Sequence, residues 1–371
     1  MRHSSVKRHE LPVIWLDDIR TWDASCLDQG VYAPLTRFMG QEDYEAVLES
    51  MRLTSGALWP LPIVLPVAGD VYTKIEPGMT VRLQGIGGFS AHMTVEDKFR
   101  RNLAREAEQV YGTLGRSHPG VDRLFKEPDG VLSGSLKDVR VPDTGYPEPH
   151  WPHEVRQILK ERGFRSVAFF QTRNPLHRAH EALQKTALEM VDALVLHPLV
   201  GPTKADDVPA PLRMKTYRQV LDTYFPRDRV ILAVFPPAMR YAGPKEALFH
   251  AITRKNYGAT HFVVGRDAAG VGNFYLPDQA LNLVESHARE IGITPLTFHS
   301  FGYCPVCESI ASARSCPHHD QWWSLSGTEL RRRLRLGIEV PPQILRPGVA
   351  RILQSAYRGE DDDSEEEEAS S

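Results

Sequence analysis

The chain has 371 residues, enough for two or three domains with apolar cores. Apolar residues make up 42% and charged residues 25% of it, and no apolar run approaches the roughly 18 residues that a membrane-spanning helix needs. Net charge is −3, but residues 360–368 carry eight acidic side chains, so the rest of the chain is mildly basic. That balance suits an anionic ligand such as a nucleotide or an oxyanion. No concentrated basic stripe is present, so nucleic-acid binding is not expected.

The N-terminal part, residues 1–145, is irregular and rich in strand-forming residues. The sequence predicts a short helix over Gln41–Met51 and strands over Leu61–Val67 and Val81–Gln84. Residues 1–10 lack an apolar stretch that could act as a signal peptide, so we expect a cytoplasmic protein that binds no membrane. Four prolines between Val141 and Pro152 indicate a linker between domains.

The pattern changes to alternating strands and helices in residues 146–302. This alternation predicts a doubly wound parallel α/β sheet, whose ligands bind beyond the carboxyl ends of the strands. The expected strands are Ser166–Phe170, Ala193–Val200, Val230–Phe235, His261–Val264 and Pro295–Ser300, and the expected helices are His177–Met190, Leu212–Tyr224, Lys245–Tyr257 and Pro277–Ile291.

A smaller C-terminal region is predicted over residues 303–358. It opens with a cysteine-rich segment, and a basic helix follows, with Ser326 and Glu329 spaced as in a capping box. Residues 359–371 form an acidic low-complexity tail that we expect to be disordered.

The most informative segment is residues 169–181, Phe-Phe-Gln-Thr-Arg-Asn-Pro-Leu-His-Arg-Ala-His-Glu. A buried strand ends there and Pro175 is predicted to open a helix, so that His177 and His180 share one face of its first turn. A helix N-terminus binds phosphate and favours neutral imidazoles in the free protein. An arginine in the turn can grip an oxyanion with two hydrogen bonds. The segment therefore indicates chemistry on a nucleotide phosphate, although two histidines at this spacing also occur by chance.

These residues resemble the signature of the ATP sulfurylase (sulfate adenylyltransferase) family. Further segments resemble that family in the expected order, from about residue 30 to 350: Phe38-Met39-Gly40, Met51-Arg52-Leu53, Leu58 to Ile63, Met239 to Pro244, Arg254 to Phe262 and Ser326-Gly327-Thr328. The resemblance implies a PUA-like N-terminal domain over 1–145, a nucleotidyltransferase domain over 146–302 and a small C-terminal domain over 303–358.

The resemblance also implies the reaction, in which sulfate attacks the α-phosphorus of ATP to give adenosine 5′-phosphosulfate and pyrophosphate. Mg²⁺ would be bound mainly by the phosphates. The implied catalytic residues are Thr172, Arg173, Asn174, His177 and His180, and the implied substrate-binding residues are Gln171, Arg173, Arg240, Gly265, Arg266, Asp267 and Ala269. Gln171 and Arg173 would bind sulfate, and Arg240 would close over the site. We also expect a homo-oligomer, whose size the sequence does not give.

One departure from the family pattern stands at Ala268, where the family has histidine in Gly-Arg-Asp-His-Ala-Gly. Two alternatives to the main interpretation therefore stay open. The chain could be a catalytically weak relative with a regulatory or RNA-binding role, or a nucleotidyltransferase that acts on another oxyanion. The sequence does not show whether the reaction serves sulfate assimilation or runs toward ATP.

Three of the four cysteines, Cys304, Cys307 and Cys316, lie within thirteen residues and are followed by His318 and His319. In a cytoplasmic protein such a cluster is more typical of a structural zinc site than of disulfides. Cys316-x2-His319 has the more usual knuckle spacing, so His319 is the first choice for the fourth ligand and His318 the second. The alternative is a loop of reduced thiols.

Overall fold

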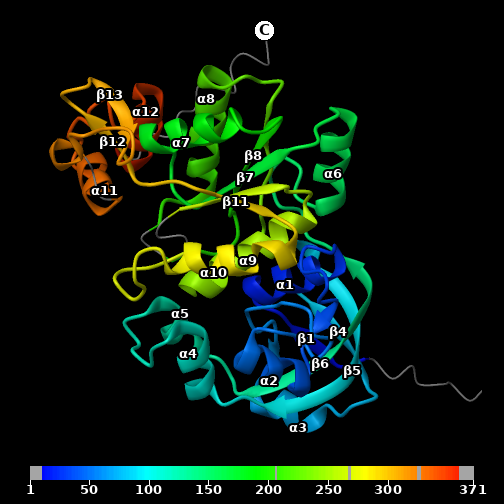
Figure 1. Cartoon of the computed structure of the whole chain (residues 1–371). Helices are drawn as coiled ribbons and strands as arrows, with labels where there is room; N and C mark the ends of the chain where they lie inside the picture. Colours follow the sequence, from blue (N-terminus) through cyan, green and yellow to red (C-terminus); the bar gives the residue numbers. More distant parts are fainter. Residues whose placement is uncertain (1–10, 205–206, 266–268, 324–326, 359–371) are drawn as a thin grey trace, which may run out of the picture. The chain divides into compact units, whose positions relative to one another are not determined.

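The computed structural model describes residues 11–204, 207–265, 269–323 and 327–358 (Figure 1). The chain divides into two compact units. The first comprises residues 1–147, 236–256 and 269–275, and the second comprises residues 148–235, 257–268 and 276–371. This differs from the predicted division in that two inserts from the predicted catalytic domain pack with the N-terminal part. Residues 303–358 also cluster with the second unit and do not form a separate one.

The first unit is built on a six-stranded mixed sheet in the order β1-β4-β5-β6-β2, with β3 also paired to β6. Its elements are β1 Val13–Trp15, α1 Asp18–Asp28, β2 Arg37–Phe38, α2 Gln41–Ser50, β3 Leu65–Pro66, α3 Gly69–Lys74, β4 Thr80–Gln84, a 3₁₀ turn Ile86–Gly88, β5 Ser90–Arg100, α4 Leu103–Tyr111, α5 Pro119–Leu124, β6 Gly130–Arg140 and α9 Gly243–Asn256. Strands β1 and β4 are parallel, and the remaining pairs are antiparallel.

The long pair β5 and β6 is the main feature of this sheet that the sequence did not predict. Buried residues alternate with less buried ones along the first half of β5 at Ala91, Met93 and Val95, and this period of two is a strand signal that the sequence prediction left out. Gly134 in β6 is required because a Cβ there would lie 2.0 Å from the Thr94 carbonyl oxygen. Helix α9 joins the same core, where the Phe249 ring packs against Tyr32 at a centroid distance of 5.4 Å.

The second unit contains a five-stranded sheet in the order β11-β10-β7-β8-β9, and every pair of neighbours is parallel. Its elements are α6 Pro152–Glu161, β7 Val167–Thr172, α7 Arg178–Leu188, β8 Ala193–Pro198, α8 Ala210–Tyr224, β9 Val230–Leu232, β10 His261–Val264, α10 Gln279–Ile291, β11 Thr294–Thr297, β12 Phe301–Cys304, β13 Ser309–Ser312, a 3₁₀ turn His319–Gln321, α11 Gly327–Arg335 and α12 Pro347–Arg358. The predicted doubly wound sheet is confirmed. Val167–Phe170 of β7 and Ala193–Leu196 of β8 are apolar and buried, as a parallel sheet covered on both faces requires.

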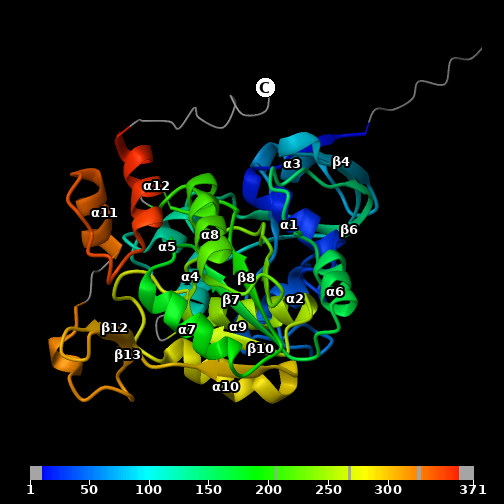
Figure 2. The same ribbon diagram turned by 90° about the horizontal axis from the view of Figure 1, so that it is seen from above.

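Two details of the second unit differ from the sequence prediction. Helix α7 begins at Arg178 with His177 as its N-cap, so Pro175 lies before the helix instead of opening it. The C-terminal residues add an antiparallel hairpin of β12 and β13 that contacts α7, and α12 contacts α8. The hairpin beside α7 and helix α12 beside α8 can be seen in Figures 1 and 2. Among the described residues, no helix is long and apolar enough to cross a membrane.

Candidate active site and metal centre

The carboxyl ends of β7 and β10 define the site in the second unit. These neighbouring strands flank the point where the strand order reverses, since the chain continues from β7 to β8 on the opposite side. Such a switch point is where open parallel sheets bind ligands. Gln171 and Thr172 are the last residues of β7, and Gly265 follows β10 directly. The structure therefore brings these predicted residues to one edge of one sheet.

The two histidines of the motif lie face to face at the start of α7. Their rings are stacked with centroids 3.7 Å apart and planes within 19°. The backbone N–H of His180 donates to Nδ1 of His177 at 3.3 Å, so His177 caps the helix with its ring instead of with a hydroxyl or carboxylate. Nδ1 of His180 is buried and has no hydrogen-bond partner among the described residues. Both rings are half-buried at a helix N-terminus, the position at which phosphates bind.

Burial keeps both imidazoles neutral in the free protein. It lowers the pKa of His177 to about 4. Burial, together with the neighbouring His177, lowers the pKa of His180 well below its ordinary value. The lowered pKa values agree with the expectation from the helix N-terminus, but the main cause is burial, which removes water from around the charged ring. A bound polyanion would favour the protonated rings, so these groups can respond to charge that arrives with a substrate.

The hydroxyl groups of Thr172 and Tyr217 stabilise the turn between β7 and α7. The Thr172 hydroxyl accepts from the Asn174 N–H and donates to the Asn174 carbonyl oxygen, both at 3.1 Å. The Tyr217 hydroxyl donates to the same carbonyl oxygen at 2.8 Å. Thr172 therefore fixes the turn, while Asn174 is exposed and Gln171 is half-buried.

The loop after β8 adds residues that the sequence reasoning missed. Nε of Arg173 lies 3.6 Å from Oδ2 of Asp207, and Nζ of Lys204 lies 3.4 Å from Oδ1 of the same carboxylate. The Asp207 side chain is only 3% exposed. The sequence did give a reason to consider Lys204 and Asp207, because both follow the second predicted strand just as Arg173 follows the first.

The glutamate at the end of the motif has a structural role. Glu181 is buried in the first turn of α7 and accepts two hydrogen bonds from Arg346, at 2.6 and 2.9 Å, and one from Lys185 at 2.7 Å. Burial acts against ionisation, but the bonds from Arg346 and Lys185 hold the pKa of Glu181 below its ordinary value. The N–H of Arg178 donates to the Ile344 carbonyl oxygen at 2.9 Å. The segment before α12 thus braces the start of α7.

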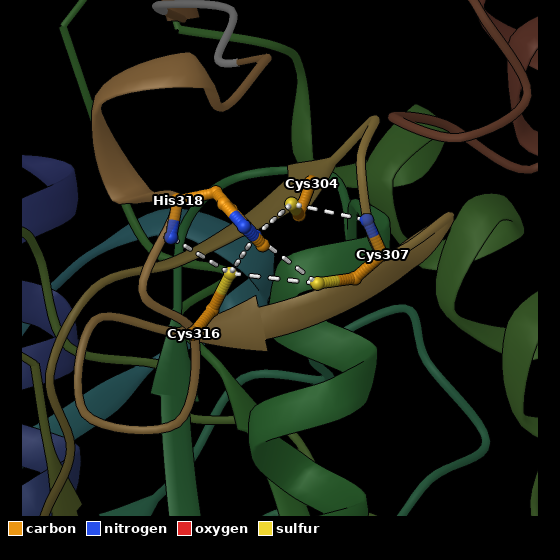
Figure 3. A group of neighbouring side chains, drawn as sticks. All are labelled: Cys304, Cys307, Cys316 and His318. Carbon is orange, nitrogen blue, oxygen red and sulfur yellow. Dashed lines mark hydrogen bonds between the residues drawn. The ribbon is translucent and has the colours of Figure 1, made fainter.

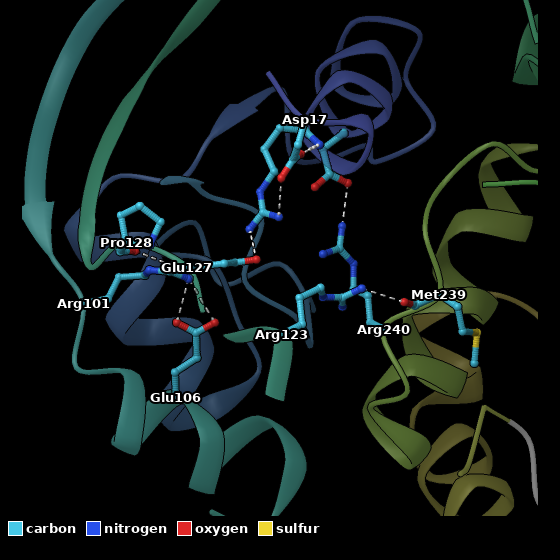
Figure 4. A network of polar contacts seen from close by, with 10 residues as sticks. Asp17, Arg101, Glu106, Arg123, Glu127, Pro128, Met239 and Arg240 are labelled. Atoms are coloured by element: carbon cyan, nitrogen blue, oxygen red, sulfur yellow. Dashed lines mark hydrogen bonds and ion pairs between the residues drawn. The ribbon is translucent and has the colours of Figure 1, made fainter. Parts of the chain in front are cut away.

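The remaining predicted substrate-binding residues lie either in the first unit or outside the described residues. Arg266 and Asp267, like Ala268, lie outside the described residues. Ala269 belongs to the first unit and has a left-handed backbone with φ of 57°. Arg240 also belongs to the first unit, where its guanidinium donates to Asp23 of α1 at 2.5 Å (Figure 4). The predicted closing role of Arg240 gains no support from this contact, because Asp23 already neutralises the side chain.

A cavity of about 30 Å³ lies beside Arg240 in the first unit. Buried ion pairs line it: Arg20 contacts Glu127 at 2.5 Å, and Arg101 contacts Glu106 at 3.2 Å. Four arginines line the cavity, Arg20, Arg101, Arg123 and Arg240, together with the three carboxylates of Asp23, Glu106 and Glu127. Ion pairing of this kind offsets much of the cost of burying the charged groups.

A second cluster lies on the β12–β13 hairpin and the loop after it (Figure 3). One donor atom from each of Cys304, Cys307, Cys316 and His318 lies within 4.8 Å of the others. The Sγ atoms of Cys307 and Cys316 are 3.8 Å apart, and Nδ1 of His318 is 3.8, 3.5 and 3.8 Å from the three sulfurs in chain order. The Cys307 N–H donates to Sγ of Cys304, as a metal-binding knuckle requires. These four atoms could hold a metal ion.

The structure corrects the first choice for the fourth donor of this cluster. His319 is more than half exposed, and its Nε2 lies 3.3 Å from the Asp320 carboxylate, while the ring of His318 faces the sulfurs. The tight turn in which the His318 N–H donates to Sγ of Cys316 favours Cys-x-His over the Cys-x2-His spacing. The sequence could not distinguish the two because adjacent histidines offer the same chemistry.

Comparisons with known proteins agree with this architecture. A family model described as ATP-sulfurylase matches residues 149–356, and one described as a PUA-like domain matches residues 2–140. A solved structure described as a hexameric APS kinase from Thiobacillus denitrificans has a TM-score of 0.72 at 24% identity, over 93% of this chain and 62% of that chain. At that identity the likeness shows the fold alone.

Relatives at much higher identity cover nearly the whole chain. A protein of Chloroflexus aurantiacus described as sulfate adenylyltransferase is 48% identical over 94% of this chain and 92% of its own length. One of Symbiobacterium thermophilum with the same description is 46% identical over 96% and 92%. One of Deinococcus radiodurans is 46% identical over 90% and 87%. The chain therefore belongs to the ATP-sulfurylase family.

Proposed function

We propose that this chain is a sulfate adenylyltransferase that converts ATP and sulfate to adenosine 5′-phosphosulfate and pyrophosphate. Relatives with that description, matched over nearly their full length, support the activity. The observation that carries the proposal is the arrangement at the end of β7, where an arginine and two stacked neutral histidines meet the N-terminus of α7. That arrangement suits two anions that must approach one another.

The proposed step is a displacement at the α-phosphorus. A sulfate oxygen forms the new bond to phosphorus while the bond from that phosphorus to the oxygen bridging the β-phosphorus breaks. The electron pair leaves with pyrophosphate, and no proton needs to move because sulfate is fully ionised. The protein therefore contributes mainly positioning and charge stabilisation. Mg²⁺ would be held chiefly by the phosphates and would offset their negative charge.

In this proposal the residues divide by the part of the substrate that they meet. Gln171 and Arg173 bind sulfate, and Asn174, His177 and His180 contact the phosphates. Thr172 keeps the turn in shape through its two hydrogen bonds to Asn174. Gly265, Arg266, Asp267 and Ala269 contribute the loop after β10. The role of Arg240 in substrate binding stays a prediction, and its guanidinium is paired with Asp23 in the first unit.

The cysteine cluster is proposed to hold structural Zn²⁺ through Cys304, Cys307, Cys316 and His318. Tetrahedral zinc with ligand bonds of about 2.3 Å to sulfur and 2.05 Å to nitrogen places sulfurs about 3.8 Å apart, and sulfur and nitrogen about 3.6 Å apart. The observed separations of 3.5 to 3.8 Å fit this geometry. Four protein ligands leave no position for a substrate, so the ion would support the hairpin against α7.

The proposal is tested by measuring pyrophosphate release from MgATP with and without sulfate. Sulfate-dependent release at a rate well above background is expected. Release that depends on another oxyanion and ignores sulfate would favour a different substrate. Absence of release with saturating MgATP and sulfate, in zinc-loaded protein, would favour the regulatory alternative that Ala268 raised.

A further inference from the structure

Helix α8 presents a buried tyrosine to the turn between β7 and α7. Tyr217 is fully buried, and its hydroxyl donates to the Asn174 carbonyl oxygen at 2.8 Å. Arg213 lies one turn earlier on the same face of α8 and is 1% exposed. Its guanidinium donates to the carbonyl oxygens of Leu199 and Val208, each at 2.8 Å. Two buried side chains of one helix therefore bind three backbone carbonyl oxygens of the segments that follow β7 and β8.

The Asn174 carbonyl oxygen receives a second hydrogen bond from inside the turn. The Thr172 hydroxyl donates to it at 3.1 Å, so the oxygen has two donors, the number that its two lone pairs can accept. Burial raises the pKa of the Tyr217 hydroxyl, which therefore stays protonated and remains a donor. Both lone pairs of this carbonyl oxygen are thus bound by hydroxyl hydrogens, one of which comes from α8.

The residues of this turn are held in different ways. Thr172 is the last residue of β7, and its carbonyl oxygen is bonded to an N–H of the segment after β8. Nε of Arg173 lies 3.6 Å from the Asp207 carboxylate. Asn174 lies beyond the strand, and the Tyr217 hydroxyl ties its backbone to α8. Loss of that hydroxyl should therefore displace Asn174 more than Arg173.

The position of this carbonyl oxygen matters because the proposed site at the turn binds two anions. A backbone carbonyl oxygen carries partial negative charge, so an unbound one beside a phosphate would repel it. When both lone pairs are bound to hydroxyl hydrogens, that charge is offset. The groups left to face the substrates are then the N–H donors and the cationic side chains that stabilise an anion.

We propose that Tyr217 is a positioning residue for the phosphate-binding part of the site. Its hydroxyl keeps the Asn174 carbonyl oxygen bound to α8, which sets the backbone from which the Asn174 side chain meets the phosphates. This rests on the proposed function, because it deepens the role given there to Asn174. Tyr217 itself touches no substrate. The competing interpretation is that its hydrogen bond contributes to stability alone.

The test compares Tyr217→Phe with Tyr257→Phe. Tyr257 is fully buried in the same unit, and its hydroxyl donates to the His150 carbonyl oxygen at 2.8 Å, so phenylalanine removes the same kind of bond outside the turn. Three quantities are measured: the dissociation constant of pyrophosphate by calorimetry without turnover, the KM for sulfate at saturating MgATP, and the free energy of unfolding in urea.

Tyr217→Phe should weaken pyrophosphate binding at least about tenfold and change the sulfate KM by less than about threefold, because Arg173 is held separately. Tyr257→Phe should change neither by more than about twofold, although both variants should lose stability. If Tyr217→Phe does not fold, Thr172→Val removes the other hydroxyl from the same carbonyl oxygen and should weaken pyrophosphate binding in the same selective way.

The proposal is overturned if Tyr217→Phe binds pyrophosphate as tightly as Tyr257→Phe does. It is also overturned if the sulfate KM rises as much as the pyrophosphate dissociation constant or more, since that result would indicate a loosened site rather than a displaced Asn174. Absence of sulfate-dependent turnover in the unmodified protein would instead count against the proposed function, and pyrophosphate calorimetry would still decide the role of Tyr217.

Discussion

The neutral state of His177 makes a quantitative prediction about pH. Burial lowers its pKa to about 4, whereas an unfolded histidine titrates near 6.5, so the unfolded chain binds the proton more readily between these values. Stability from this group is fully present above pH 6.5 and is lost as the pH falls through 6.5 toward 4. At pH 5 the two pKa values give a loss of about 2 kcal/mol relative to pH 7.5.

His177→Asn isolates this effect because asparagine caps a helix and does not titrate. At pH 7.5 the variant should unfold with nearly the free energy of the unmodified protein, since the cap to the His180 N–H can be retained. Between pH 7.5 and 5 it should lose about 2 kcal/mol less than the unmodified protein does, measured by urea unfolding at both values. His177→Ala should instead cost about 1 kcal/mol at either pH through the lost cap.

Direct titration checks the same reasoning without unfolding. In protein labelled with ¹³C at the histidine Cε1 position, the His177 resonance should move with a midpoint near pH 4 and the His180 resonance should stay in its neutral position at pH 6. Saturating pyrophosphate should raise the His177 midpoint, because bound negative charge favours the protonated ring. A midpoint near 6.5 in the free protein would refute the argument from burial, as would an equal loss of stability in His177→Asn.

Three further predictions concern the site and its supports. Arg173→Ala should fold normally and lose at least about a hundredfold in turnover, the scale of one electrostatic donor, and wild-type turnover at saturating sulfate would remove Arg173 from the site. Cys304→Ser should lower the melting temperature and abolish a content of about one zinc per chain measured by atomic absorption, whereas His319→Ala should retain the zinc. Glu181→Gln and Arg346→Gln should each lower kcat, and the double variant should be no worse than the poorer single one, because the pair braces α7 as a unit. Strictly additive losses in that cycle would separate the two residues.

The sequence predicted the second unit well because its signals are local. Apolar runs such as Val167–Phe170 alternate with amphipathic helices, and that pattern leaves few arrangements other than a parallel sheet. The motif at the end of β7 could also be identified from the sequence, because its residues are contiguous. Asp207 and Arg346 were missed because the residues that they contact, Arg173 and Glu181, are distant in the chain.

The first unit was predicted less well, because its packing depends on residues that are distant in the chain. Helix α9 was read as part of the strand and helix alternation, yet it packs with Tyr32 and Trp59 near the start of the chain. Nothing in its composition distinguishes these partners from those of the parallel sheet. The contact of Arg240 with Asp23 was not predicted for the same reason, because it spans 217 residues of sequence. The role of Ala268, the homo-oligomer and the cytoplasmic location stay predictions.

The most direct test of the account follows the sulfate itself. The protein is incubated with MgATP and [³⁵S]sulfate, and labelled adenosine 5′-phosphosulfate and released pyrophosphate are both quantified. Transfer of the adenylyl group to sulfate predicts equal amounts of the two products, with neither formed when sulfate is omitted and both reduced at least about a hundredfold in Arg173→Ala. Pyrophosphate released without labelled phosphosulfate, or no product from zinc-loaded protein at saturating substrates, would contradict the account.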